Sequence, residues 1–204
     1  MFENNGLINA RLDEVDGFKV YTVDNFFKNP HDILDLLNQH EPVLWKNWEN
    51  PSYNGIHFAD RRHVIQSDEI IPIQEMIAEL CDRDPISPNE AYTNITQFND
   101  KTFNNYKDNF WWPHRDEGFT CIIYLNHNTF PGTNLYRIIE DDKLEGPEHF
   151  APWRNKTKYQ IISTIEASFN KLILFDAKNL LHGMAVVDDT FFHLERRNMV
   201  MFFK

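Results

Sequence analysis

Two histidines and one aspartate in this 204-residue chain have the types and order of a three-residue metal site. His114 and Asp116 are separated by one residue and stand just before the apolar segment Phe119–Leu125. His182 follows a second apolar run, Leu172–Phe175. Two imidazoles and one carboxylate can hold Fe(II) on one face and leave three coordination positions open for a co-substrate and oxygen. We therefore predict that these three residues are metal ligands at a catalytic centre.

The spacing of His114 and Asp116 suits a strand, because strand side chains alternate between faces with a period of two. Both ligands would then lie on one face, and the third must come from another strand. His182 is preferred for that role because an apolar run precedes it and Gly183 follows it. Three further histidines are expected at the surface or in packing: His127, His149 and His193.

Two helices are expected in the first 85 residues. Asn29 is a suitable N-cap and Pro30 a suitable first residue for one helix, and a second helix is predicted from Ser67 to about Cys81. Residues 42–66 between them are rich in Trp, Asn and His and show no clear periodicity. This segment is predicted to be a long loop of the kind that covers substrates.

Strand-like segments dominate the rest of the chain. One is expected at residues 18–24, and from residue 91 onward they follow one another at Tyr92–Phe98, Phe119–Leu125, Leu135–Ile139, Gln160–Glu166, Lys171–Phe175, Met184–Val187 and Arg197–Phe203. Such a succession of short strands predicts an all-β barrel or a double-sheet jelly roll.

Composition and charge narrow the classes of function. The formal net charge of −11 disfavours general nucleic-acid binding, which needs clustered cations. A local basic mouth from Lys101, Lys107 and Arg115 remains compatible with that charge. Cys81 and Cys121 are expected to be buried free thiols of a reducing compartment. The start of the chain lacks a signal pattern and no apolar run reaches about 18 residues, so a cytoplasmic protein is expected.

Two adjacent arginines, Arg196 and Arg197, stand at the start of the last apolar strand. Neighbouring strand residues point to opposite faces, so one arginine can enter the barrel while the other faces solvent. A buried guanidinium needs a partner, and a small dicarboxylate would supply a bidentate one. The alternative is that both side chains lie at the rim of the barrel.

The order of these segments resembles that of the Fe(II)/2-oxoglutarate-dependent oxygenases, and specifically of their prolyl-4-hydroxylase-like branch. The resemblance is carried by His114-x-Asp116, Thr120–Asn126, Pro131–Tyr136, Leu174-Phe175, His182-Gly183, the Arg-headed final strand and the opening segment Val23–Pro30. The chain departs from the family pattern at Pro131, where the family has the first glycine of a pair. The interval between His182 and Arg196 is also longer than usual.

The resemblance implies a mostly β fold, the double-stranded β-helix (jelly-roll or cupin-like), buttressed by N-terminal helices. It implies one domain over residues 1–204, with helical support and a lid in residues 1–90 and the β core with the metal site in residues 91–204. By the same resemblance His114, Asp116 and His182 ligate Fe(II).

The resemblance also implies a set of 2-oxoglutarate ligands. Tyr124, Arg196 and Asn198 match family positions that bind the co-substrate. A register shift of one residue would give the role of Arg196 to Arg197, with Met199 where a small hydroxyl residue is usual. Arg196 is preferred because Phe202 then occupies the family's aromatic position.

The implied activity is a dioxygenase that hydroxylates a protein side chain or a small molecule and releases succinate and CO2, with ascorbate as an optional further cofactor. Asp116 favours hydroxylation, because halogenating relatives generally lack this carboxylate. Two other classes stay open. One is a non-catalytic jelly-roll binding module, and the other is a cupin-type metalloenzyme that does not use 2-oxoglutarate.

Several aromatic and basic residues are candidates for contact with the substrate. Trp111 and Trp112 could cover it, or could pack in the core. The same alternatives hold for three residues of the predicted loop, Trp45, Trp48 and Tyr53. Arg61 and Arg62 in that loop are either substrate contacts or a solvated basic pair.

Overall fold

The structure is a computed structural model that describes residues 1–39, 43–44, 58–98, 105–141 and 152–204. Its β-strands are β1 Arg11–Val15, β2 Phe18–Val23, β3 Val43–Leu44, β4 Phe58–Gln66, β5 Glu90–Phe98, β6 Asn109–Trp111, β7 Phe119–Tyr124, β8 Phe130–Ile138, β9 Trp153–Asn155, β10 Tyr159–Ala167, β11 Leu172–Asp176, β12 Leu181–Met184 and β13 Arg196–Phe203. Its α-helices are α1 Pro30–Gln39, α2 Ile71–Cys81 and α3 Thr190–His193. Short 3-10 turns occupy Asp68–Ile70, Asn105–Lys107 and Lys156–Lys158.

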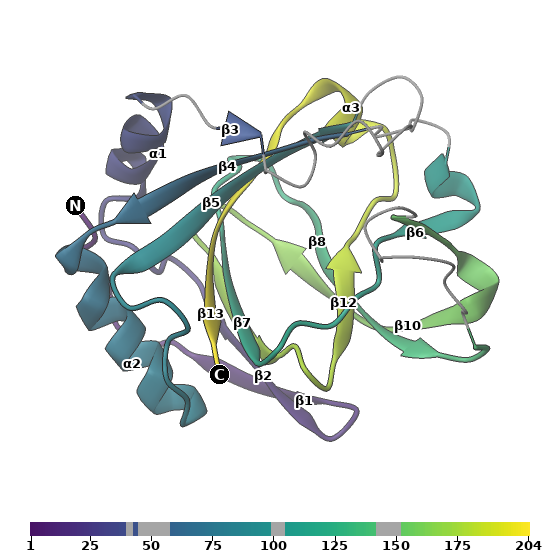
Figure 1. The fold of residues 1–204 in the computed structure, drawn as a ribbon, viewed down its shortest axis with the longest axis horizontal. Helices are drawn as coiled ribbons and strands as arrows, with labels where there is room; N and C mark the ends of the chain where they lie inside the picture. The colour runs from purple at the N-terminus through teal and green to yellow at the C-terminus, as the bar shows by residue number, and fades with distance from the viewer. Residues whose placement is uncertain (40–42, 45–57, 99–104, 142–151) are drawn as a thin grey trace.

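The strands form a double-stranded β-helix, as predicted. Eight of them make a large antiparallel sheet in the order β1-β2-β11-β7-β13-β5-β4-β3. A smaller sheet has the order β10-β8-β12, and β6 pairs with β9. In Figure 1 the smaller sheet stands beside the concave side of the large one, while α1 and α2 lie on the other side. Side chains from both sheets line one cavity between them.

The two expected N-terminal helices are present. α1 begins at Pro30, and α2 follows a 3-10 turn capped by Ser67, whose Oγ accepts a hydrogen bond from the backbone N–H of Glu69. Ile33 of α1 and Ile73 of α2 are buried in one cluster against the large sheet. Burial of this kind, rather than intrinsic helix propensity, supplies most of the stability of such short helices.

Alternation along the central strands separates two apolar layers. On β7, Ile123 belongs to the cluster under the helices, whereas Ile122 and Tyr124 belong to the cluster between the sheets. On β13, Met199 packs under the helices while Asn198 lines the inner cavity. Strand alternation thus decides which side chains of the large sheet reach the space between the sheets.

The prediction of a loop over residues 42–66 is wrong for the second half of that segment. Phe58–Gln66 is the nine-residue strand β4, which pairs with β5 along its whole length. The strand signal was hidden because β4 carries charged and polar side chains, including Arg61 and Arg62, where a buried strand would show apolar residues. The three aromatic residues Trp45, Trp48 and Tyr53 lie outside the described residues.

Two other expectations need correction. A third helix, α3, lies in the later part of the chain, where only strands were expected; its single turn is too short to show periodicity. The strand expected at Met184–Val187 instead covers Leu181–Met184, and Val187 is exposed beyond its end. The large sheet also includes β1, β2, β3 and β4, so residues before 91 contribute to the β core as well as to the helices.

Cys81 and Cys121 are buried free thiols, as expected. Among the described residues, no helix is both long and apolar enough to cross a membrane.

Candidate metal centre and its cavity

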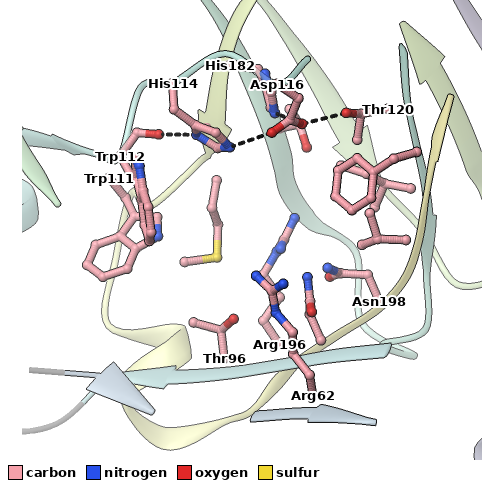
Figure 2. A pocket seen from close by; sticks show the side chains of 17 residues that line it. Arg62, Thr96, Trp111, Trp112, His114, Asp116, Thr120, His182, Arg196 and Asn198 are labelled. Carbon is pink, nitrogen blue, oxygen red and sulfur yellow. Dashed lines mark hydrogen bonds and ion pairs between the residues drawn. The ribbon is translucent and has the colours of Figure 1, made fainter. Parts of the chain in front are cut away.

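The structure brings His114, Asp116 and His182 together. One potential ligand atom from each lies within 4.8 Å of the other two. His114 Nε2 is 3.8 Å from one carboxylate oxygen of Asp116, and His182 Nε2 is 3.4 Å from the other. Figure 2 shows the three side chains converging at one end of a cavity. The three residues chosen from the sequence therefore form one cluster.

The main chain, rather than strand alternation, positions the two histidines. The N–H of His114 donates to the carbonyl of His182, and the N–H of His182 donates to the carbonyl of His114, both at 2.9 Å. His114 thus forms an isolated bridge to β12, and Asp116 lies outside any strand. The expectation that the pair shares a strand is wrong. The N–H of Asp116 is held by the carbonyl of Ala177 at 3.1 Å.

Backbone carbonyls orient both imidazole rings. Nδ1 of His114 lies 2.7 Å from the carbonyl oxygen of Trp112, and Nδ1 of His182 lies 3.3 Å from that of Leu180. In the neutral tautomer that donates from Nδ1, Nε2 carries a lone pair and can bind a metal. Trp112 has a φ of +43°, an uncommon conformation for a bulky residue, which turns its carbonyl toward His114.

Gly183 allows the chain before His114 to lie close to β12. A Cβ atom at this position would be 2.5 Å from the carbonyl oxygen of Trp111 and 2.8 Å from that of Trp112. Those contacts are shorter than van der Waals distances, so any side chain would push the two segments apart. The small residue after His182 is therefore part of how the centre is built.

Asp116 is held in its ionised form. Burial raises the pKa of this carboxyl, but contacts with His182 and His114 and a hydrogen bond from the Thr120 hydroxyl, 2.5 Å long, lower it by more. The pKa of Asp116 consequently lies well below its usual range. An ionised carboxylate beside two imidazoles is what a divalent cation requires of its ligands.

The donor set fits a divalent metal. Bonds of about 2.1 Å at right angles would separate the ligand atoms by about 3 Å. The separations of 3.4 and 3.8 Å are slightly wider, so small side-chain movements would complete the geometry. Two nitrogen ligands and one oxygen ligand on one face are typical of non-haem Fe(II) centres with open positions.

The triad faces a cavity of about 230 Å³. Among the described residues, two arginines line it, Arg196 of β13 and Arg62 of β4. Figure 2 shows both at the end opposite the triad, beside Asn198 and Thr96. Its remaining walls are mostly apolar or aromatic and include Trp111, Trp112, Ile122, Met184, Val200 and Phe202.

The two adjacent arginines of β13 point to opposite faces of the large sheet, because side chains alternate along a strand. Arg196 is only 7% exposed, lines the cavity and lies with its guanidinium carbon 5.7 Å from the centre of the Tyr124 ring. Arg197 points away and contacts Glu195 and Asn38. The structure therefore places Arg196, rather than Arg197, where a ligand in the cavity could meet it.

Tyr124, which the resemblance assigns to co-substrate binding, is not itself among the residues that line the cavity. It is fully buried, and its hydroxyl lies 2.7 Å from Oγ1 of Thr133, which does line the cavity. Burial raises the pKa of Tyr124 to about 12, against smaller lowering effects of Arg196 and Thr133. The phenol therefore stays protonated. Gly132 packs so tightly here that a Cβ atom would lie 2.8 Å from the Tyr124 hydroxyl.

Asn126 holds the main chain on both sides of Arg196. Its Nδ2 donates to the carbonyl of Glu195 and its Oδ1 accepts from the N–H of Arg197, both at 2.7 Å. The Glu195 carboxylate in turn binds Arg197 at 2.8 Å and also contacts Arg61. This arrangement, which we call the Asn126 clamp, fixes the residue before and the residue after Arg196 outside the cavity, so Arg196 must point inward.

Some residues that line the cavity were not predicted from the sequence, or were predicted in the wrong element. Arg62 was a candidate contact, but in a loop rather than on β4. Asn94, Thr96 and Thr133 were not singled out, because short polar residues within strands carry no distinctive spacing. Of the three residues that could have formed a local basic mouth, Lys107 and Arg115 are exposed and do not line the cavity, and Lys101 lies outside the described residues.

Comparison with known proteins gives a likeness of fold only. No family model and no curated protein matches the chain. A crystal structure of an oxidoreductase of the 2OG-Fe(II) oxygenase family from Burkholderia pseudomallei matches with a TM-score of 0.51 and 12% identity. That match covers 91% of this chain and 84% of the other.

Two other solved structures match more loosely. One is ycfD from E. coli, with a TM-score of 0.44 and 13% identity over 97% of this chain and 54% of that chain. The other is the epimerase SnoN in complex with Fe3+, alpha ketoglutarate and nogalamycin RO, with a TM-score of 0.45 and 12% identity over 89% and 77% of the two chains. With TM-scores below 0.5, these two matches carry no argument. The match to the Burkholderia protein shows a likeness of fold alone, so the chemistry must be argued from the site.

Proposed function

We propose that this chain is an Fe(II)- and 2-oxoglutarate-dependent dioxygenase that hydroxylates a protein side chain or a small molecule and releases succinate and CO2. One observation carries the proposal. His114, Asp116 and His182 face a single cavity into which Arg196 also reaches from the opposite sheet (Figure 2). A metal site and a buried guanidinium in one cavity suit a ligand with a chelating group at one end and a carboxylate at the other.

Each residue has a distinct task in this proposal. His114, Asp116 and His182 would hold Fe(II), which supplies the activation of oxygen that side chains cannot perform. Arg196 would bind the far carboxylate of 2-oxoglutarate in the bidentate manner that guanidinium geometry favours. Tyr124 would keep Thr133 in place beside that carboxylate.

The walls of the cavity serve the same chemistry. Met184, Val200 and Phe202 present apolar surface around the space between the triad and Arg196. Apolar walls exclude water, which strengthens the charged contacts inside and protects reactive groups from side reactions. The likeness of fold to a protein described as a 2OG-Fe(II) oxygenase is consistent with this assignment.

The test is an anaerobic titration of Fe(II)-loaded protein with 2-oxoglutarate, followed by the visible charge-transfer band that the chelated complex produces. We expect the band in the wild type, its loss in Asp116→Ala and a much higher 2-oxoglutarate requirement in Arg196→Ala. Arg197→Gln, on the opposite face of β13, should bind 2-oxoglutarate nearly as well as the wild type.

The competing classes give different results. A folded protein that binds the metal but shows no band would be a cupin-type metalloenzyme that does not use 2-oxoglutarate. A folded protein that binds neither metal nor 2-oxoglutarate would be a binding module. Release of succinate and CO2 under oxygen, followed by a screen of peptides and small metabolites for the gain of an oxygen atom, then identifies the substrate.

A further inference from the structure

Four side chains on four adjacent strands form one row across the large sheet. Arg62 of β4 is the register partner of Asn94 of β5, and Asn94 is the partner of Asn198 of β13. Asn198 is in turn the partner of Tyr124 of β7. Directly opposed residues on paired strands project to the same face with Cβ atoms about 5 Å apart. The row therefore places two amides side by side, between a guanidinium and a phenol.

The row faces the cavity at the end away from the metal ligands. Arg62, Asn94 and Asn198 all line the cavity, and Arg196 lies two residues before Asn198 on the same face of β13. Figure 2 shows Arg62, Arg196 and Asn198 rising from the sheet toward the space below the triad. Two cationic side chains and two amides thus converge on one part of the cavity.

The two amides are not satisfied by the protein. Asn198 is only 3% exposed, yet within the part of the chain that the structure describes its Oδ1 has no hydrogen-bond partner, and the buried Oδ1 of Asn94 has none there either. Buried amide groups in this state are uncommon, because each costs the free energy of its lost hydration. Rotation of an amide by half a turn exchanges its oxygen for an N–H donor. The pair can therefore offer N–H donors to a ligand in the cavity.

The charges decide which kind of ligand fits. Arg62 and Arg196 place two positive charges in one small cavity, which disfavours an ammonium or other cation there. Among the described residues that line the cavity, Asp116 is the only carboxylate, and it belongs to the metal site. A ligand carboxylate beside the row would accept hydrogen bonds from guanidinium and amide donors together.

We propose that Arg62 and Asn94 are co-substrate-binding residues, which together with Arg196 and Asn198 form a four-side-chain carboxylate subsite. This inference rests on the proposed function and extends it. It makes Arg62 a specificity-determining residue, which selects a dicarboxylate 2-oxo acid over a monocarboxylate one of the same length. Arg62 acts on ligand binding and has no part in holding the metal.

The test measures ligand affinity rather than turnover. Mn(II)-loaded protein is titrated anaerobically by calorimetry with 2-oxoglutarate and with 2-oxopentanoate, which has the same carbon chain without the far carboxylate. Arg62→Met keeps the length of the side chain and removes its charge. We expect it to weaken 2-oxoglutarate binding about tenfold or more while changing 2-oxopentanoate binding less than twofold. Arg11→Met, on the exposed edge strand β1, is the matched control and should bind both ligands as the wild type does.

Two further variants keep the test decisive. Arg62→Lys retains the charge without the planar fork and should fall between the wild type and Arg62→Met. Asn94→Leu should weaken 2-oxoglutarate binding several-fold, and it supplies the test if Arg62→Met does not fold. Two results would overturn this inference and leave the proposed function intact. One is wild-type affinity for 2-oxoglutarate in both folded variants, Arg62→Met and Asn94→Leu. The other is an equal loss of affinity for 2-oxoglutarate and 2-oxopentanoate. If the metal-loaded wild type does not bind 2-oxoglutarate, the proposed function itself fails.

Discussion

His114 and His182 exchange two backbone hydrogen bonds, each 2.9 Å long, so the main chains that carry the two imidazoles are joined directly. The link ties the segment before β7 to β12 of the smaller sheet. These bonds involve no side-chain atoms, so they hold the two histidine positions together whichever side chains are present. We therefore expect side-chain substitutions at the triad to abolish metal binding without unfolding the protein.

The first prediction concerns metal-dependent stability. Wild-type protein with a metal at about a hundred times its dissociation constant should gain about 2.7 kcal/mol, or roughly 5–10 °C in Tm. Asp116→Ala removes the only carboxylate of the triad and should lose this gain. Differential scanning fluorimetry with and without Mn(II) measures it. Asp13→Ala on exposed β1 is the control, and a wild-type metal shift in Asp116→Ala would show that the triad does not hold the metal.

The second prediction concerns Gly183. In Gly183→Ala the added methyl group would press on the Trp111 and Trp112 carbonyls and force the chain before His114 away from β12. We expect a loss of about 1–3 kcal/mol in the free energy of unfolding and a weaker metal affinity. Urea unfolding and a Mn(II) titration measure the two effects. Unchanged metal affinity in the folded variant would mean that this close approach does not govern the position of His114.

The third prediction concerns the Asn126 clamp. Asn126→Ala removes two backbone-directed hydrogen bonds that flank Arg196, so 2-oxoglutarate should bind several-fold more weakly. The free energy of unfolding should fall by about 1–3 kcal/mol, because the backbone groups lose their partners. Mn(II) affinity should be unaffected, since the clamp does not touch the triad. Asn128→Ala, at an exposed position nearby, is the control. An equal loss of Mn(II) affinity would point to general disruption instead.

The fourth prediction is a pH dependence that arises from Glu195. Its burial raises the pKa, but hydrogen bonds with Arg197 and Arg61 outweigh burial and lower it. A carboxylate with a lowered pKa in the folded state contributes stability that is present above its unfolded pKa, about 4.3, and is lost as the pH falls through the folded value.

Glu195→Gln should therefore be less stable than the wild type at pH 7, by no more than about 1 kcal/mol because the side chain is 27% exposed. The difference should shrink as the pH falls below about 4. Urea unfolding at pH 7 and pH 3 measures it, with Glu75→Gln on the exposed face of α2 as the matched control. A difference that is constant with pH would contradict the ionic contribution.

Local features of the chain were predictable wherever the signal lay within a few residues. Pro30 and its neighbours mark the start of α1, and the apolar runs mark β7 and β11. His114, Asp116 and His182 could be chosen as ligands because their types are chemically distinctive and their flanking segments are apolar. The strand β4 could not be predicted, because its polar residues resemble those of a loop until β5 is placed beside them.

By itself, then, the sequence determined the three candidate metal ligands, the mostly β architecture and the two arginines, Arg196 and Arg197, of which one could enter the barrel. Only the tertiary structure decided that Arg196 faces the cavity and that Arg62 joins it there. The physical reason is register. A shift of one residue turns every side chain of a strand to the other face, and register is set by pairing between strands far apart in the chain. The pairing of β13 with β5 and β7, together with the Asn126 clamp, supplies that information.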